Sequence, residues 1–390
     1  MNNIKSFMRK IFSLTLASSL LAGVAIAKEE TITIGYTGPL SGGAALYGKN
    51  ALTGIQKAAD DINKEGIRIN NNTYKLNIVA LDDKYSPSET AINGRRLVQE
   101  HGAKFIFVPH SGGTFALQTF NVRSNFMIFS YSSLPAIIEK KNPLTVRIPE
   151  SFDIYFPTYI KTQMEKYGKK LGIAVTNSDY GRTYSKAFEK AWKDAGGEVV
   201  SNNLMAYNTS ADFYSSVGRI LDAKPDVILI GGPSEPTALV AKQIRELGFK
   251  GGFIVTDQAK FNEMQRILGD YSMLEGAIGT IPMQPEVRTE SIPFIEEFVK
   301  NHPEYKGKQF TNELVLTYAT VHILANAMKQ ANSTDDLKAI YSKLDAAVQA
   351  LEPKYNPIQI NHFVAPGSFT YNSSAVVVKD GKLQRVPLIK

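Results

Sequence analysis

The stretch Phe105-Ile-Phe-Val-Pro-His-Ser-Gly-Gly-Thr-Phe-Ala-Leu-Gln118 joins a strand signal to a helix signal through a short polar turn. Its first four residues are apolar, which is typical of a strand buried on both faces of a parallel sheet. In the turn, His110 to Thr114, backbone N–H groups and hydroxyls point to one place. The positive end of the following helix makes that place attractive to an anion such as a carboxylate. An ordinary loop whose Ser and Gly only cap the helix would have the same sequence.

Strand and helix signals alternate on both sides of this stretch. In the first part of the chain the expected strands are 31–36, 74–81, 105–108 and 127–131, and the expected helices are 50–63 and 86–101. The second of these helices opens with Ser86-Pro-Ser-Glu89, a capping box with proline at the first helical position. This order predicts an α/β fold with a doubly wound parallel sheet and right-handed crossovers.

The pattern then repeats in the second half of the chain. Residues 171–175 and 226–230 read as strands, and the latter run into Gly231-Gly-Pro-Ser-Glu235 and a further helix. Because 390 residues are too many for one typical core, two doubly wound domains of similar build are expected. The mostly helical region 292–350 and the β-rich region 358–387 are too short for a third sheet domain, so we expect them to complete the first two.

The first 27 residues have the three parts of a secretory signal. A basic start is followed by an apolar stretch and by Ala25-Ile-Ala27, an A-x-A cleavage site. The chain contains no cysteine, so neither a lipid anchor nor a disulfide is expected. We therefore expect a freely soluble periplasmic protein.

Composition and motifs give no support to nucleic-acid binding or catalysis. Without Lys5, Arg9 and Lys10 the formal charge falls by three, from +7 to +4, and no basic run remains. Gly43 to Asn50 nearly matches a phosphate-binding loop but lacks its final Ser or Thr. The five histidines have no metal-ligand spacing, and no G-x-S-x-G is present. No catalytic residue, metal or cofactor is predicted, and the chain is not expected to be an enzyme.

The mature chain resembles the periplasmic solute-binding proteins of the branched-chain amino acid (Leu/Ile/Val) type, which serve ABC importers. The resemblance covers nearly everything from Thr31 onward. Its markers are Ile34-Gly-Tyr-Thr-Gly-Pro-Leu-Ser-Gly42, Tyr47-Gly48, Gly54 with Ala58-Ala-Asp-Asp-Ile-Asn63, Asp82-Asp83 with Pro87, Asp179-Tyr-Gly181, Asp212-Phe213, Pro225-Asp226 and Gly231-Gly232. These markers are specific for the family and much less so for the ligand.

The resemblance implies a type I periplasmic binding protein, with two Rossmann-like lobes joined by three crossover segments. The ligand lies in the cleft between the lobes, which close by hinge bending and present a surface to the membrane permease. The crossings are expected near Arg147–Ser151, Thr280–Met283 and Asn356–Pro366. The expected limits are a signal peptide at 1–27, a first lobe at 28–147 and 283–357, and a second lobe at 148–282 and 358–390.

The resemblance also implies roles for residues at the cleft. The ligand's α-carboxylate falls on the first-lobe turn, with His110, Ser111 and neighbouring backbone, and on Ser132 and Ser133 after the next strand. The carbonyl of Tyr131 and the carboxylate of Asp257 would accept from the α-ammonium, while Tyr47 and Tyr180 cover the ligand from each lobe. A zwitterion that loses its water needs such donors and acceptors.

One departure concerns the second-lobe turn. Amino-acid-binding relatives carry an aromatic residue after Gly231-Gly232, whereas this chain has Pro233, which has no N–H to donate. Ser234 or Glu235 could replace the lost contact. The carboxylate contact is therefore expected more firmly than the amino-group contact.

Three functions stay open at this point. The first is the receptor of an importer, expected from the resemblance to be a monomer, for an amino acid or another small carboxylate. The second is a binder of an aromatic carboxylate or short amide in the same fold, since tyrosines and Phe115 lie near the expected site. The third is a sensory ligand-binding protein.

Overall fold

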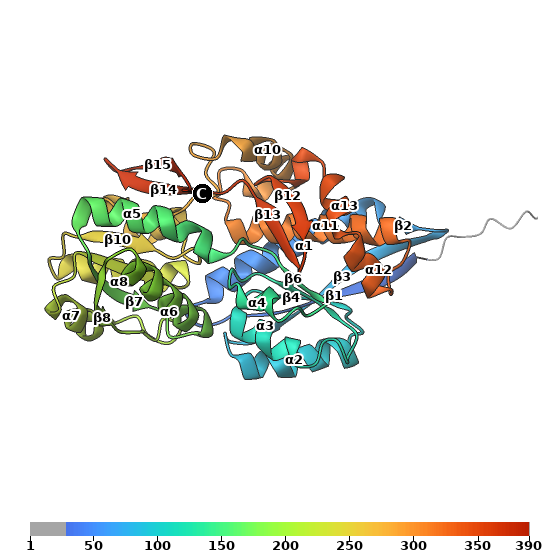
Figure 1. Cartoon of the computed structure of the whole chain (residues 1–390). Helices are drawn as coiled ribbons and strands as arrows, with labels where there is room; N and C mark the ends of the chain where they lie inside the picture. The colour runs from blue at the N-terminus through green and yellow to red at the C-terminus, as the bar shows by residue number, and fades with distance from the viewer. Residues whose placement is uncertain (1–28, 390) are drawn as a thin grey trace, which may run out of the picture.

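The computed structural model describes residues 29–389, which form two lobes side by side (Figure 1). The expected signal peptide, with its cleavage site, lies outside the described residues. Within the described part, no helix is long and apolar enough to cross a membrane.

The first lobe is built on an eight-stranded sheet in the order β12-β13-β6-β5-β4-β1-β3-β2. These strands are β1 (Glu29–Gly38), β2 (Ile67–Ile69), β3 (Asn72–Asp82), β4 (Phe105–Val108), β5 (Met127–Ser130), β6 (Thr145–Arg147), β12 (Ile360–Val364) and β13 (Ser368–Tyr371). Its helices are α1 (Ala45–Glu65), α2 (Pro87–Gln99), α3 (Ser111–Gln118), α4 (Ala136–Glu139), α10 (Ile292–Asn301), α11 (Asn312–Ala331), α12 (Leu337–Ser342) and α13 (Leu344–Gln349).

The second lobe is built on a seven-stranded sheet in the order β15-β14-β11-β10-β9-β7-β8. These strands are β7 (Lys170–Val175), β8 (Glu198–Asn202), β9 (Val227–Gly231), β10 (Gly252–Val255), β11 (Ile278–Thr280), β14 (Ser374–Lys379) and β15 (Lys382–Pro387). Its helices are α5 (Phe156–Tyr167), α6 (Asp179–Asp194), α7 (Tyr214–Asp222), α8 (Ser234–Glu246) and α9 (Phe261–Leu268).

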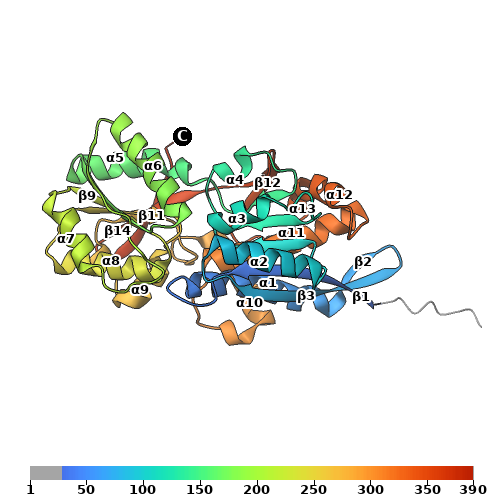
Figure 2. The ribbon, with the colours of Figure 1, turned by 90° about the horizontal axis from the view of Figure 1, so that it is seen from below.

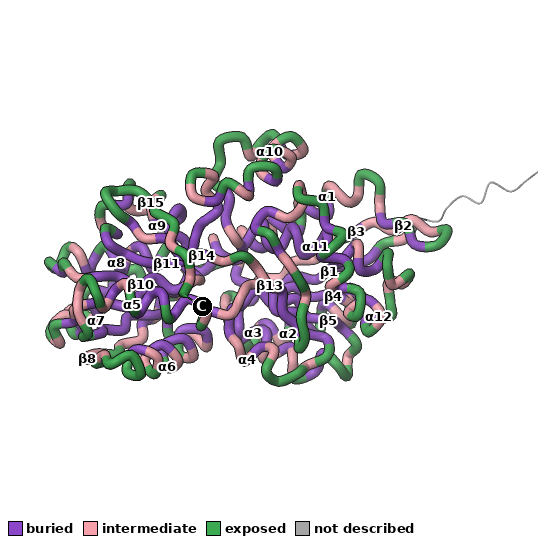
Figure 3. The backbone as a smooth tube through the Cα atoms, turned by 45° about the horizontal axis from the view of Figure 1, so that its top comes forward, coloured by how far each residue is buried: buried purple, intermediate pink, exposed green. Residues whose placement is uncertain are grey.

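Both sheets are parallel in their centres, which confirms the fold class that the alternating signals predicted. The four residues of β4 are all buried, and β4 pairs in parallel with both β1 and β5. Antiparallel pairs occur only toward the edges, for example between β14 and β15. Figure 3 shows the buried strands inside each lobe and the exposed loops and helix surfaces around them.

The chain passes between the lobes after β6, after β11 and after β13. The third passage lies at Asn372–Ser373, not near Asn356–Pro366 as the sequence suggested. Strands β12 and β13 belong to the first sheet, where Ser368 pairs with Arg147 of β6. Figures 1 and 2 both place β12 beside the first lobe and β14 in the second.

This result corrects the expected domain limit, since residues 358–371 complete the first lobe. The reason is physical. The apolar pattern of a segment indicates that it forms a strand, but it does not show which of the two sheets the strand joins. In the structure the side chains of Ile358, Ile360 and Phe369 are buried in the first-lobe core.

Candidate ligand-binding site

A cavity lies between the two lobes at the carboxyl ends of their parallel strands, which is where open α/β sheets bind ligands. It encloses about 730 Å³ of empty space, part of it open to solvent. The first lobe contributes residues that follow β4 and β5, and the second lobe contributes residues from α6 and the loop after β10. The segments that cross between the lobes line one end of it.

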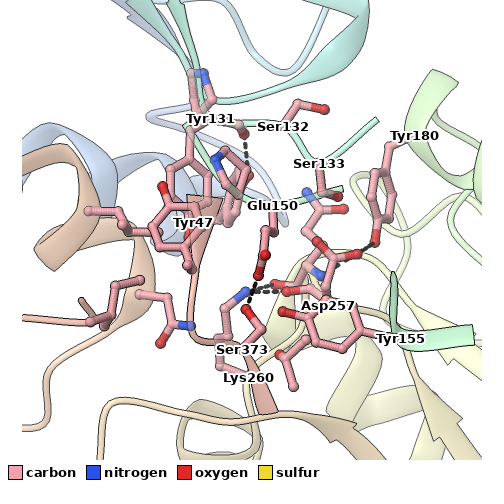
Figure 4. Close-up of a pocket in the computed structure, with 18 of the residues that line it drawn as sticks. Tyr47, Tyr131, Ser132, Ser133, Glu150, Tyr155, Tyr180, Asp257, Lys260 and Ser373 are labelled. Carbon is pink, nitrogen blue, oxygen red and sulfur yellow. Dashed lines mark hydrogen bonds between the residues drawn. The ribbon is translucent and has the colours of Figure 1, made fainter. Parts of the chain in front are cut away.

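Eight of the ten residues predicted from the sequence line this cavity. They are Tyr47, His110, Ser111, Tyr131, Ser132, Ser133, Tyr180 and Asp257. They come together because β4 and β5 are neighbours in register, Val108 beside Ser130, so that the turns after these strands open at the same edge of the sheet. Figure 4 shows Ser133 of the first lobe beside Asp257 of the second.

Both ring nitrogens of His110 make hydrogen bonds that fix the turn after β4. The N–H of Gly113 donates to Nδ1 at 3.0 Å, so that nitrogen carries no proton. Nε2 therefore holds the proton and donates to Oδ2 of Asp83 at 2.8 Å, with both side chains buried. Thus His110 caps α3 and positions Ser111, and its ring nitrogens are already used.

Three serine hydroxyls around the cavity are buried and lack a well-formed hydrogen bond within residues 29–389. They belong to Ser111, Ser132 and Ser133. The Ser133 hydroxyl lies near enough to Asp257 to lower the pKa of that carboxyl. A buried hydroxyl without a partner costs free energy, on the order of 1–3 kcal/mol. A ligand carboxylate would supply the missing acceptors.

Two tyrosines of the first lobe form one wall of the cavity. The hydroxyl of Tyr47 donates to the carbonyl oxygen of Tyr131 at 3.0 Å, and their rings meet edge to face. A carbonyl oxygen has two lone pairs, so Tyr131 can still accept from a ligand. Figure 4 shows this bond at the side of the space that faces Glu150.

The carboxylate of Asp257 faces these groups from the second lobe. Its Oδ1 accepts from the hydroxyl of Tyr180 at 2.6 Å. Burial raises the pKa of Asp257, while Lys260 and the hydroxyl of Tyr180 partly oppose that shift. No cation lies within ion-pair distance of this carboxylate among the residues that the structure describes. A protonated amine would be a natural partner for it.

The ammonium of Lys260 reaches the cavity and is held there by groups of the protein. It donates to the carbonyl oxygens of Asp257 and Gln258 and lies 3.0 Å from Oε1 of Glu313. Two N–H groups of the ammonium are therefore used in hydrogen bonds, and its charge is paired with a buried carboxylate. Lys260 and Glu313 are almost fully buried and belong to different lobes, so their ion pair ties the lobes together.

Pro233 and Ser234, the two remaining predicted residues, do not line the cavity. Pro233 is the N-cap of α8. The Ser234 hydroxyl donates to the carboxylate of Glu263 at 2.5 Å and accepts from the backbone N–H of Lys260 at 3.0 Å. The second-lobe turn therefore points its hydroxyl into its own lobe and supplies no ligand contact in this arrangement.

Sequence reasoning missed the residues at the end where the chain crosses between lobes. Glu150, Arg288, Tyr371 and Ser373 line the cavity there, and Tyr155 lies beside them. Glu150 falls inside the crossing expected near Arg147–Ser151, which was a usable signal. Arg288 and Ser373 follow no motif or periodicity, so nothing in the sequence marked them.

The described residues contain no group of three or more His, Cys, Asp or Glu side chains that could hold a metal ion. The cavity instead offers hydroxyls, carboxylates and aromatic rings. This set can bind a small polar molecule through hydrogen bonds and charge.

Comparison with known proteins identifies the family of this chain. A family model described as periplasmic binding protein matches residues 31–367. The Leu/Ile/Val-binding protein BraC3 of Rhizobium johnstonii is 26% identical over 339 residues, which cover 85% of this chain and 88% of that protein. It is named as a binding protein, which is consistent with the expectation that this chain is not an enzyme.

Solved structures share the two-lobed fold. The branched-chain amino acid transporter substrate-binding protein LivJ of Streptococcus pneumoniae, in complex with isoleucine, has a TM-score of 0.73 at 21% identity and covers 93% of this chain and 100% of its own. An ABC transporter solute-binding protein from R. palustris, in complex with 4-hydroxybenzoate, has a TM-score of 0.70 at 19% identity, with 93% and 96% covered. The chain belongs to the periplasmic binding protein family and has its type I fold, close to the branched-chain amino acid group.

Proposed function

We propose that this protein is the extracytoplasmic substrate-binding component of an ABC importer, and that it binds an amino acid or a related small carboxylate in the cavity between its lobes. One observation carries the proposal. Buried serine hydroxyls without partners lie on the first lobe, and a buried aspartate without a cation faces them from the second. A zwitterion supplies the acceptor and the donor that these two sides lack.

Contacts between the lobes support closure over the ligand. Asn208 of the second lobe accepts from the N–H groups of Gly43 and Ala44 at 3.0 Å each. Gln258 donates to the Tyr85 hydroxyl at 2.8 Å across the same gap. Exchanging these particular hydrogen bonds for bonds to water costs little free energy, so they would not oppose opening of the lobes. The closed protein then docks, as a monomer in the periplasm, on a membrane permease.

A second candidate ligand is an aromatic carboxylate or a short amide. The rings of Tyr47, Tyr85, Tyr131, Tyr155 and Tyr180 all line the cavity, and they would suit a flat ligand. A structural neighbour with the same fold holds 4-hydroxybenzoate. In that case the serines would still bind the carboxylate, and Asp257 would have no ammonium to accept from.

A thermal-shift screen of the purified protein tests the proposal. The panel contains amino acids, benzoate-like acids, aliphatic acids and amides at millimolar concentration. A ligand at a hundred times its dissociation constant should stabilise the fold by about 2.7 kcal/mol. Hits among amino acids support the first candidate, and hits only among acids without an amino group support the second. If no compound in these classes shifts the melting temperature, the proposed function is wrong.

A further inference from the structure

The end of the cavity near the crossings carries a carboxylate without a cationic partner. Glu150 lies just after β6, in the first passage between the lobes, and lines the cavity. Its Oε2 accepts a hydrogen bond from the hydroxyl of Ser373, which stands in the third passage. Figure 4 shows the Glu150 side chain extending into the middle of the space between the first-lobe tyrosines and Asp257.

The neighbouring cations are held by other groups. Arg147 donates through Nε and Nη2 to the Ser368 hydroxyl, at 3.2 and 2.9 Å. Arg288 donates to the carbonyl oxygens of Ile281 and Pro282 and lies 3.9 Å from Glu290. Neither guanidinium lies within 4.0 Å of the Glu150 carboxylate, although both lower its pKa from a distance. Burial outweighs them and raises the pKa of Glu150 to about 7.

The charges around the cavity are therefore uneven. Lys260 makes two hydrogen bonds to carbonyl oxygens and an ion pair with Glu313. Asp257 and Glu150 receive hydrogen bonds only from hydroxyl and backbone groups and have no ion pair within the described residues. Asp257 already matches the α-ammonium of the proposed ligand. Glu150, on a different wall, is left for another group.

We propose that Glu150 is a specificity-determining residue that binds a second protonated nitrogen of the ligand, so that the cavity takes a small basic amino acid in preference to an aliphatic one. This inference rests on the proposed function and names its substrate class. An aliphatic side chain placed here would displace water from the Glu150 carboxylate without replacing the lost hydrogen bonds, which costs free energy. An ammonium or guanidinium would complete the pair, and sites built to bind a polar group reject analogues without it.

Calorimetric titration of the purified protein tests this inference. The ligands are L-lysine and L-ornithine, with L-norleucine and L-leucine as matched compounds without the distal nitrogen, and 4-hydroxybenzoate and acetamide as members of the other classes. The unmodified protein should bind lysine or ornithine at least about tenfold more tightly than norleucine, as expected for a hydrogen bond to a charged group.

Two variants test whether Glu150 causes the preference for basic ligands. Glu150→Gln keeps the size and an acceptor for Ser373 but removes the charge, and it should abolish the preference for the basic ligands. Glu198→Gln makes the same change on an exposed residue that does not line the cavity, and it should keep that preference. Thermal melts show whether each variant is folded.

The outcomes separate this inference from the proposed function. If leucine or norleucine binds as tightly as the basic ligands, or if Glu150→Gln keeps the preference, the inference is overturned and the proposed function stands. Binding of only 4-hydroxybenzoate or acetamide overturns the inference and favours the second candidate ligand. Absence of binding by every compound overturns both.

Discussion

The carboxylate of Asp257 is the group expected to bind a ligand's amino group. It is buried, and it accepts a hydrogen bond from the Tyr180 hydroxyl together with weaker contacts. We expect Asp257→Asn to weaken binding of an α-amino acid by about 2 kcal/mol or more, since a buried charge pair is lost. Binding of a simple aromatic acid should change little. Calorimetric titration with both ligands checks this. An amino acid that binds the variant as tightly as the unmodified protein would remove Asp257 from the site.

Glu150 should also leave a signature in the protein without ligand. Burial raises its pKa to about 7, so the folded state holds this proton more tightly than the unfolded state does. The stability that the proton contributes is complete below the ordinary pKa of a glutamate, and it is lost as the pH rises toward 7. Glu150→Gln never carries the charge.

We therefore expect Glu150→Gln to melt above the unmodified protein at pH 8, and by a smaller margin at pH 5. Thermal unfolding at the two pH values measures this. The matched variant Glu198→Gln, on an exposed carboxylate, should show the same small difference in melting temperature at both pH values. A margin for Glu150→Gln that does not grow with pH would contradict the raised pKa.

Helix α1 packs closely against α11 in the first lobe. A Cβ added at Gly54 would lie 2.0 Å from the carbonyl oxygen of Leu314 and 2.3 Å from Oγ1 of Thr317. The same hydroxyl donates to the carbonyl of Ala51, at 2.8 Å. The helices approach closely because Gly54 has no side chain.

We expect Gly54→Ala to lower the free energy of unfolding by about 1–3 kcal/mol, because one of the helices must move away. Gly218, in α7, has no atom within 4 Å of an added Cβ. Gly218→Ala should instead raise it by about 0.5–1 kcal/mol, through helix propensity and a less flexible unfolded chain. Chemical denaturation of both variants measures the contrast, and equal effects would contradict the packing argument.

The helices and strands that the sequence predicted are those whose formation depends on residues adjacent in the chain. The apolar run 105–108 and the turn after it were found because a buried parallel strand and a helix start each leave a pattern in adjacent residues. The destination of β12 and β13 was not found, because sheet membership depends on residues far away in the chain.

The candidate site likewise contains some residues that local patterns predict and others that only the folded chain brings together. Ser111, Ser133 and Asp257 follow strands, so their place at the sheet edge followed from topology, with the family resemblance adding their roles. Arg288 and Ser373 lie in crossing segments without periodicity, and only the assembled lobes bring them to the cavity. Ser234 was expected there, but Glu263 and Lys260 turn its hydroxyl inward.

A buried charge cluster lies between the two lobes. Lys260 of the second lobe pairs with Glu313 of the first, and Glu263 of the second accepts from Asn50 of the first at 2.5 Å. Burial, and then repulsion by Glu313, raise the pKa of Glu263 to about 7. Lys260 is the cation that this cluster of two acids shares.

Removing that cation should destabilise the protein strongly. Lys260→Met leaves Glu313 buried without a partner, so we expect a loss of about 3–5 kcal/mol in the free energy of unfolding. Lys57→Met breaks a more exposed pair, with Glu304 at 2.8 Å, and should cost less than about 1 kcal/mol. Chemical denaturation compares the two. A loss for Lys260→Met as small as that for Lys57→Met would show that the cluster does not hold the lobes.

The measurement that tests the central claim most directly is a calorimetric titration of the double variant Ser111→Ala, Ser133→Ala with the ligand that the unmodified protein binds best. If the two hydroxyls hold the ligand's carboxylate, affinity should fall by about a hundredfold or more, because two hydrogen bonds to a charged group are lost. A control double variant, Ser88→Ala with Ser342→Ala, removes two exposed hydroxyls and should bind normally. Undiminished affinity of the first double variant for a carboxylate ligand would contradict the assignment of the site.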